Sequence, residues 1–420
     1  MEGYRIRGGR PLEGEVEISG AKNAALPLLA ASVLTRGENT FSSVPEISDV
    51  DSMVKILKGL GCSVKKEKET VTVDASNMSE CSIPEEFMKE MRSSVFLAGA
   101  LLARCGEAVI TSPGGCDIGR RPIDIHIKGL ESMGARMEKR DGRMIIKGPL
   151  LKGTKIRLKY PSVGATENIM LAATGAEGVT VIENSAREPE IEDLQKYINR
   201  CGGRISGAGT GRIEIEGGKR LTGCSHRIMG DRIEAGTYML MALGTGGCIY
   251  LKNTEPSHME YPVRFLKGGG WDIFCRENTI TAKGRGSLRG CSFSTAPYPG
   301  FPTDLHPQTA AFLAVRGRDC EIEENIFEKR FKYAKELIKM GADIEISGKK
   351  VIIGDNKILC GREVEAEDLR GGAALIMAGL MAEGTTTVGN TRYIKRGYSR
   401  LEEKIRLLGG EITEYVQREP

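Results

Sequence analysis

The sequence predicts an α/β fold of two similar domains, each built of three repeats in which sheets surround buried helices. Two observations predict it. An apolar stretch rich in Ala and Leu, followed by a Gly turn and a β-branched run, recurs six times at a spacing of about 70 residues. A more polar stretch with its own glycine stop follows each copy. A chain of 420 residues with 40% hydrophobic composition is long enough for two such domains.

The first stretch of each repeat is small and apolar on almost every side, which predicts a helix buried on all faces. The six copies run from Leu26 to Phe41, Val95 to Ile110, Asn168 to Ile182, Thr237 to Leu251, Thr309 to Ile322 and Ala373 to Val388. Their turn glycines are Gly37, Gly106, Gly178, Gly246, Gly317 and Gly384.

The second stretch of each repeat is amphipathic and ends in a glycine that can take the left-handed conformation. These helices are expected at Met53–Gly61, Ile125–Gly134, Leu194–Gly202, Val263–Gly270, Lys335–Gly341 and Leu401–Gly409. Short alternating runs follow, so the repeat is strand, helix, strand, helix, strand, strand. Gly207–Gly211 lies between two such strands and is interpreted as a hairpin turn, not a dinucleotide-binding loop.

Composition excludes several classes of protein. The formal net charge of +4 is too small to indicate a nucleic-acid or membrane binder, so an anionic ligand needs locally clustered cations. The 11 cysteines and 4 histidines form neither a Cys-x-x-Cys pair nor a cluster with metal-ligand spacing, so reduced thiols and no metal are expected. With no secretion signal and no long apolar run, the sequence indicates a cytoplasmic protein.

The loop from Ser112 to Pro122 is the most unusual stretch of the chain. It places Cys116 among three glycines and before Arg120 and Arg121. Flexibility and neighbouring positive charge favour a thiolate, which makes Cys116 a candidate reactive thiol. The alternative is an ordinary turn with an inert thiol.

Two further positions are candidates for chemistry. Lys22 stands where a turn enters the first buried helix, and free backbone N–H groups at such a position favour an anion. The alternative is a solvated lysine beside a helix cap. Asp304 follows a segment with two prolines and is a candidate general base, or a capping residue for a helix from His306 onward. Four arginines near repeat boundaries are weaker candidates for binding an anion: Arg92, Arg330, Arg370 and Arg396. The alternative for each is a solvated side chain.

Seven segments, taken together, match a known family. The chain resembles the UDP-N-acetylglucosamine 1-carboxyvinyltransferases of the enolpyruvyl transferase family, from Gly9 to the last repeat. The matching segments are Ile18–Ala25, Pro113–Cys116, Arg121–Asp124, Ser162–Asn168, Arg187–Ile191, Asp231–Thr237 and Pro299–Asp304.

This resemblance implies the inside-out α/β barrel fold, with one domain at 22–229 and another formed by 1–21 and 230–420. The active site is then expected in the cleft between them. The implied reaction moves the enolpyruvyl group of phosphoenolpyruvate onto the 3′-hydroxyl of UDP-N-acetylglucosamine and releases phosphate, without a cofactor. It is the first committed step of peptidoglycan precursor synthesis, hence of cell-wall formation and cell division, and the family is sensitive to fosfomycin.

The resemblance also assigns residues. Phosphoenolpyruvate contacts are implied for Lys22, Cys116, Arg121 and Arg396, with Arg330 and Arg370 beside them. Nucleotide-sugar contacts are implied for Asn23, Arg92, Arg121, Pro122, Ile123, Asp124, Ile125, Ser162, Val163, Gly164, Asp304 and Ile326. Asp304 is then the expected base for the sugar hydroxyl, and Cys116 the expected acid at C3 of phosphoenolpyruvate. Two places depart from the family pattern, Tyr160 and the pair Gly371 and Gly372.

Two other functions remain open from the sequence. The first is the sister enolpyruvyl transferase acting on shikimate 3-phosphate, against which Cys116 and its glycine loop argue. The second is a catalytically silent paralogue that binds the nucleotide sugar as a regulator or scaffold. Oligomeric state is not predicted.

Overall fold

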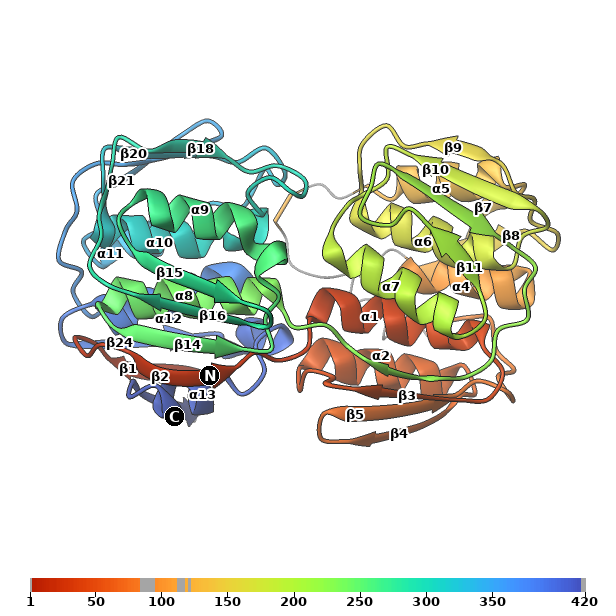
Figure 1. Cartoon of the computed structure of the whole chain (residues 1–420), viewed down its shortest axis with the longest axis horizontal. Coiled ribbons are helices and arrows are strands. Elements are labelled where there is room, and N and C mark those ends of the chain that lie inside the picture. Colours follow the sequence, from red (N-terminus) through yellow and green to blue (C-terminus); the bar gives the residue numbers. More distant parts are fainter. Residues whose placement is uncertain (1, 84–94, 112–117, 120–121, 417–420) are drawn as a thin grey trace. The chain divides into compact units, whose positions relative to one another are not determined.

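The computed structural model describes residues 2–83, 95–111, 118–119 and 122–416 (Figure 1). They divide into two compact units. The C-terminal unit holds 2–19, 118–119 and 230–416, and the N-terminal unit holds 20–83, 95–111 and 122–229. The chain passes between the units at Ser19–Gly20, two residues before the expected position, and again at Met229–Gly230.

The first helix of each repeat lies inside its unit, as the apolar stretches predicted. In the C-terminal unit α8, α10 and α12 pack against one another (Figure 1). All residues of α12 from Leu369 to Leu380 are buried, which its Ala, Gly, Leu and Met composition permits. These helices are α1 (Lys22–Ala31), α4 (Phe96–Cys105), α6 (Val163–Thr174), α8 (Arg232–Thr245), α10 (His306–Arg316) and α12 (Leu369–Met381).

The second helix of each repeat is amphipathic, and its glycine stop is confirmed in all six cases. The glycines that follow these helices have φ between +84° and +101°, a region that costs a residue with a Cβ atom more than it costs glycine. The helices are α2 (Ser48–Gly59), α5 (Asp124–Ser132), α7 (Pro189–Arg200), α9 (Glu260–Gly268), α11 (Lys332–Lys339) and α13 (Leu401–Leu407).

Sheets of the N-terminal unit follow one pattern, a parallel pair extended by an antiparallel hairpin. One has the order β13 (Ser225–Arg227), β3 (Glu38–Ser42), β5 (Thr70–Asp74), β4 (Ser63–Glu67). Another has the order β11 (Arg204–Ser206), β12 (Arg212–Glu216), β10 (Val179–Glu183), β9 (Lys155–Arg157), and its β11–β12 hairpin confirms the turn at Gly207–Gly211. The third is β6 (Glu107–Thr111), β8 (Arg143–Lys147), β7 (Arg136–Arg140), with a parallel bridge from Val109 to Ser82.

The C-terminal unit repeats the pattern. Its four-stranded sheets have the orders β15 (Asp272–Arg276), β16 (Thr279–Lys283), β14 (Cys248–Lys252), β2 (Glu13–Glu17); β18 (Ser292–Ser294), β20 (Cys320–Glu323), β22 (Lys350–Ile353), β21 (Ile344–Ser347); and β23 (Glu363–Glu365), β24 (Thr385–Gly389), β1 (Glu2–Arg7), β25 (Glu411–Val416). A short pair joins β17 (Leu288–Arg289) to β19 (Gly317–Arg318).

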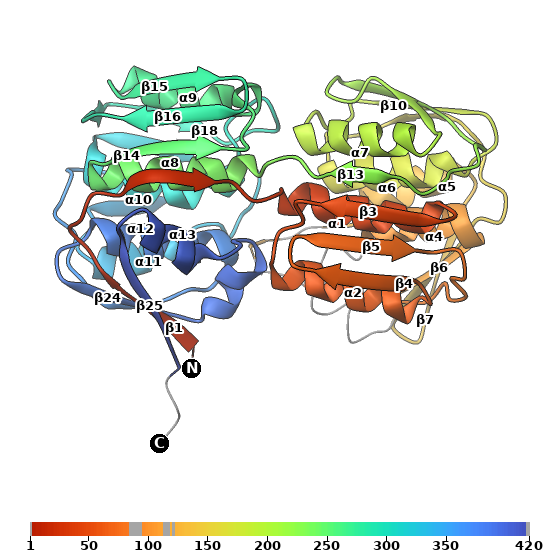
Figure 2. The ribbon, with the colours of Figure 1, turned by 60° about the horizontal axis from the view of Figure 1, so that its bottom comes forward.

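Strands from the start of the chain complete two of these sheets. β1 lies between β24 and β25, where Ile6 faces Thr386 and Ile412 across the ladder (Figure 2). β2 runs parallel to β14 and occupies the place of the first strand of that repeat. The N-terminal unit closes in the same way, because β13, its last strand, runs parallel to β3.

Gly317 differs from the other five turn glycines of the first helices. Those five have φ between +74° and +96°, whereas Gly317 is extended, with φ −110°, and already belongs to β19. The left-handed residue here is Asp319, with φ +53°. No helix within the described residues is long and apolar enough to cross a membrane.

Candidate active site

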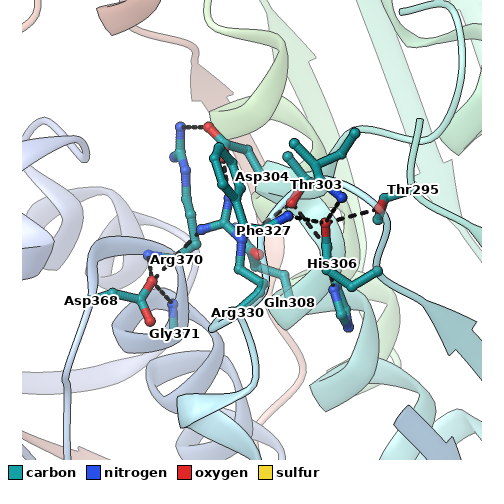
Figure 3. A network of polar contacts seen from close by, with 12 residues as sticks. Thr295, Thr303, Asp304, His306, Gln308, Phe327, Arg330, Asp368, Arg370 and Gly371 are labelled. Atoms are coloured by element: carbon teal, nitrogen blue, oxygen red, sulfur yellow. Dashed lines mark hydrogen bonds and ion pairs between the residues drawn. The ribbon is translucent and has the colours of Figure 1, made fainter. Parts of the chain in front are cut away.

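The strongest candidate site in the C-terminal unit is a carboxylate shared by two arginines (Figure 3). Asp304 lies in the 3-10 turn η4 (Thr303–Leu305), directly before the buried helix α10. Arg330 Nη2 donates to Asp304 Oδ1 at 2.6 Å, and Arg370 Nη2 donates to Asp304 Oδ2 at 3.0 Å. The structure therefore brings together three residues that the sequence singled out separately.

Charge on the arginines decides the ionisation of Asp304. Burial raises the pKa of this carboxyl, but the guanidinium groups of Arg370 and Arg330 outweigh burial and hold the pKa well below its ordinary value. Both arginine side chains are nearly inaccessible, at 3% and 2% exposure. Asp304 is consequently a carboxylate at neutral pH, held by two charge-assisted hydrogen bonds.

Two nitrogen atoms of the Arg370 guanidinium do not bond to Asp304. Its Nε and Nη1 atoms are buried and have no hydrogen-bond partner among the residues that the structure describes. The Arg370 guanidinium also lies 5.5 Å from the ring centroid of Tyr398, which supports the cation from one side. Buried N–H donors without acceptors are costly, so an anion that supplied oxygen atoms here would be bound favourably.

Arg370 is placed by the start of α12. Asp368 Oδ1 accepts hydrogen bonds from the backbone N–H groups of Arg370 and Gly371, each at 3.0 Å, and so caps this helix. A Cβ atom on Gly371 would lie 2.8 Å from Asp368 Oδ2, and one on Gly372 would lie 2.6 Å from the Ile394 side chain. Both neighbours therefore pack where a larger residue would place its Cβ atom, which explains glycine at these two positions.

Arg396 and Ile326 belong to the same unit. Arg396 ends the 3-10 helix η5 (Thr391–Arg396), which packs against α12. The Ile326 backbone N–H donates to Glu324 Oε1 at 2.8 Å, in the segment that leads to Arg330.

In the N-terminal unit, Lys22 opens α1. Its Nζ lies 2.6 Å from Asp49 Oδ2, and the two side chains are 12% and 6% exposed. Ala21, the N-cap, makes no side-chain capping bond, and the start of a helix is a position that favours an anion. Asn23 follows in the same turn.

Two further helix starts in this unit adjoin each other. Ser162 caps α6, accepting from Ala165 N at 3.4 Å, and Val163 and Gly164 form its first turn. A Cβ atom on Gly164 would lie 3.2 Å from His126 Cε1, so α6 begins beside the first turn of α5. The predicted residues at or just before that turn are Pro122, Ile123, Asp124 and Ile125.

Sequence reasoning missed several polar partners of the site. Asp368 stands before an apolar run, which is a capping signal that could have identified it. Asp49, Glu324 and His306 carry no comparable signal. Tyr160, one of the two departures from the family pattern, is 41% exposed. Arg92, Cys116 and Arg121 lie outside the described residues.

Comparison with known proteins places this site in a family. A family model described as EPSP synthase (3-phosphoshikimate 1-carboxyvinyltransferase) matches residues 6–405. The chain belongs to this family of enolpyruvyl transferases. Among relatives in the family, a protein of Caldanaerobacter subterraneus subsp. tengcongensis named UDP-N-acetylglucosamine 1-carboxyvinyltransferase 2 is 46% identical, with 98% of this chain and 99% of the relative covered.

A Clostridium botulinum enolpyruvyl transferase named UDP-N-acetylglucosamine 1-carboxyvinyltransferase is 43% identical and is covered over 100% of its length by 98% of this chain. The crystal structure of the enolpyruvyl transferase NikO from Streptomyces tendae superposes with a TM-score of 0.88 at 22% identity, covering 98% of both chains. That structural likeness establishes the fold, and the predicted two-domain enolpyruvyl transferase fold is confirmed.

The shared carboxylate gives a testable stability effect. Asp304→Asn removes the counter-ion of two buried guanidinium groups, and breaking a buried pair from one side costs about 3–5 kcal/mol. Because the pKa of Asp304 is lower in the folded than in the unfolded protein, its stabilising contribution is complete above the unfolded pKa and is lost as pH falls through the folded pKa. Urea unfolding at pH 7 should therefore show the full loss, and inorganic phosphate should recover part of it by pairing with the arginines.

The matched control is Asp141→Asn, which changes a carboxylate that is 88% exposed and should leave stability nearly unchanged. Equal unfolding midpoints for the two variants, or phosphate stabilising them equally, would show that Asp304 does not neutralise the arginine pair.

Proposed function

We propose that this chain transfers the enolpyruvyl group of phosphoenolpyruvate to the 3′-hydroxyl of UDP-N-acetylglucosamine and releases phosphate, the first committed step of peptidoglycan precursor synthesis. The observation that carries the proposal is the Asp304 carboxylate between Arg330 and Arg370. Within the described part of the chain, Nε and Nη1 of Arg370 have no acceptor. Supporting it, relatives over 98% of the chain that bear the name of this activity are 43% to 46% identical.

Both substrates are anions, which explains the chemistry of the site. Phosphoenolpyruvate and a nucleoside diphosphate together bring about five negative charges, and arginine binds carboxylates and phosphates in a bidentate way. We assign phosphoenolpyruvate to Lys22, Cys116, Arg121 and Arg396, with Arg330 and Arg370 beside them.

We assign the nucleotide sugar to Asn23, Arg92, the run from Arg121 to Ile125, Ser162 to Gly164, Asp304 and Ile326. The helix starts at α5 and α6 support this, because their N–H groups favour a diphosphate. We infer that both domains, 22–229 and 1–21 with 230–420, supply residues to the reaction.

The proposed reaction is an addition followed by an elimination. The sugar oxygen forms a bond to C2 of phosphoenolpyruvate as Asp304 accepts the hydroxyl proton and Cys116 donates a proton to C3, which gives a tetrahedral ketal. C3 then loses a proton, the C2–C3 double bond re-forms and phosphate leaves. Asp304 is a weak base while both arginines pair with it; a phosphate that accepts hydrogen bonds from Arg370 would raise the pKa of Asp304 and make it a better base.

A second function in the family, transfer to shikimate 3-phosphate, is disfavoured by Cys116 in its glycine loop and by the names of the relatives at 43% to 46% identity. A silent paralogue is disfavoured by the retention of Lys22, Cys116, Arg121, Asp304 and Arg396. We place the enzyme in the cytoplasm, in keeping with its ten described cysteines, all of which are free thiols.

A phosphate-release assay tests the function directly. The purified chain with phosphoenolpyruvate should release phosphate when UDP-N-acetylglucosamine is added and should not do so with shikimate 3-phosphate at the same concentration. Turnover only with shikimate 3-phosphate would assign the sister reaction, and tight nucleotide-sugar binding without turnover would assign a silent binding protein.

Cys116 is tested by substitution and labelling. Cys116→Ser should lower kcat by roughly 10²–10⁴, because serine is a much weaker acid, while the nucleotide sugar still binds. Cys116→Asp should recover part of the rate with a lower pH optimum, and fosfomycin should label Cys116 before the other ten cysteines. Full turnover in Cys116→Ser, or a label on a different cysteine in peptide mapping, would remove Cys116 from the mechanism.

A further inference from the structure

We propose that Glu324 is a positioning residue for the reaction, and that it acts through the hydroxyl of Thr303 to aim Arg330 at Asp304. Glu324 lies directly after β20 and is assigned no substrate contact. The inference rests on the proposed function, because Asp304 and Arg330 are the groups whose placement it concerns.

Glu324 is a buried carboxylate saturated with hydrogen bonds. The residue is 2% exposed and its side chain 0%. Oε1 accepts from Thr295 Oγ1 at 3.0 Å and from the backbone N–H groups of Ile326 and Phe327 at 2.8 and 3.0 Å. Oε2 bonds to Thr303 Oγ1 at 3.0 Å and to His306 Nδ1 at 2.7 Å. Five partners fix both oxygens of one side chain.

Four of these five partners come from the two segments that carry Arg330 and Asp304, and the fifth, Thr295, follows β18. The backbone bonds hold the turn at Ile326 and Phe327, from which the chain leads to Arg330. The bonds to Thr303 and His306 hold η4 and the start of α10, which flank Asp304. Glu324 therefore joins the segment that carries the guanidinium to the turn that carries the carboxylate.

Thr303 transmits this order to the arginine. Its hydroxyl donates to Glu324 Oε2 and accepts from Arg330 Nε at 3.2 Å. With Nε fixed there, and with the ring of Phe327 5.0 Å from Arg330 Cζ, the planar guanidinium points Nη2 at Asp304 Oδ1. Reorienting it would break the hydrogen bond to Thr303 or the one to Asp304.

His306 and Tyr333 keep Glu324 in place from behind. Burial lowers the pKa of His306, and this effect is larger than the rise caused by the hydrogen bond to Glu324. The imidazole is therefore neutral. A neutral ring can donate from Nδ1 to Glu324 and accept at Nε2 from Tyr333 OH, which lies 3.0 Å away. Burial raises the pKa of Glu324, but its bonds from His306 and the two backbone N–H groups outweigh burial and lower the pKa, so Glu324 is ionised.

Thr303 offers the sharpest test, because one atom can be exchanged at constant shape. Thr303→Val replaces the hydroxyl by a methyl group, and Thr303→Ser keeps the hydroxyl. We expect Thr303→Val to lower kcat about 10- to 100-fold, since a misplacement of about 1 Å can cost that much, with KM for UDP-N-acetylglucosamine changed less than about threefold. Thr303→Ser should recover most of the lost rate.

Glu324→Gln tests the carboxylate itself, and Glu336→Gln is its matched control. Glu336 is also 2% exposed and accepts from a backbone N–H, that of Glu365 at 3.1 Å, and from Lys339 Nζ at 2.8 Å, so these hydrogen bonds go to residues outside the site. We expect Glu324→Gln to lower kcat at least about tenfold more than Glu336→Gln. The melting temperatures of both variants are measured as well, to separate a loss of rate from a loss of folded protein.

Each remaining outcome overturns a defined statement. Wild-type kcat in Thr303→Val, no recovery in Thr303→Ser, or equal losses in Glu324→Gln and Glu336→Gln would overturn the positioning role. Absence of turnover in the wild-type chain would instead overturn the proposed function. Turnover of the wild-type chain is therefore measured before any variant is compared.

Discussion

The site depends on one carboxylate that bridges two buried arginines. Arg330 and Arg370 are 2% and 3% exposed, and two guanidinium groups cannot stay that deep and that close without a counter-ion. Asp304 supplies one, with one oxygen for each arginine, and Asp368 Oδ1 lies 3.9 Å from Arg330 Nη1. Because the arginines come from the segment after β20 and from α12, while Asp304 precedes α10, the pairing also fixes three parts of the C-terminal unit against one another. Asp368 and Glu324 then set the directions in which the arginines point.

The repeat architecture explains why polar groups gather at such places. A helix buried on all sides is apolar along its length, so polar residues are confined mainly to its ends. The N-terminal end also presents N–H groups without partners, which favour anions. Buried helices with a candidate residue at or just before the first turn are α1 with Lys22, α6 with Ser162, α10 with Asp304 and α12 with Arg370. The helices that form the core are thus also the ones that carry the proposed anion-binding residues.

Much of the fold was predictable, because it follows from local pattern. Apolar composition identified the buried helices, and the glycine stops of the amphipathic helices all have positive φ. At Gly317 the pattern was misleading, since the left-handed residue there is Asp319. Of the site, Asp304, Arg330 and Arg370 could each be proposed from the sequence, but the pairing of Asp304 with the two arginines could not. Glu324 and His306 meet across 18 positions and Arg370 and Asp304 across 66, and no local pattern reports such pairings.

The pairing of Asp304 with Arg330 and Arg370, here called the arginine clamp, is tested most directly by the charge state of Asp304. Carbon-13 NMR titration of aspartate carboxyls, with Asp304→Asn to assign the resonance, would measure its pKa in the free protein and with inorganic phosphate. The clamp predicts a pKa well below the ordinary value of about 3.9 without phosphate, and a rise when phosphate takes hydrogen bonds from Arg370. An ordinary pKa in the free protein, unchanged by phosphate, would contradict it.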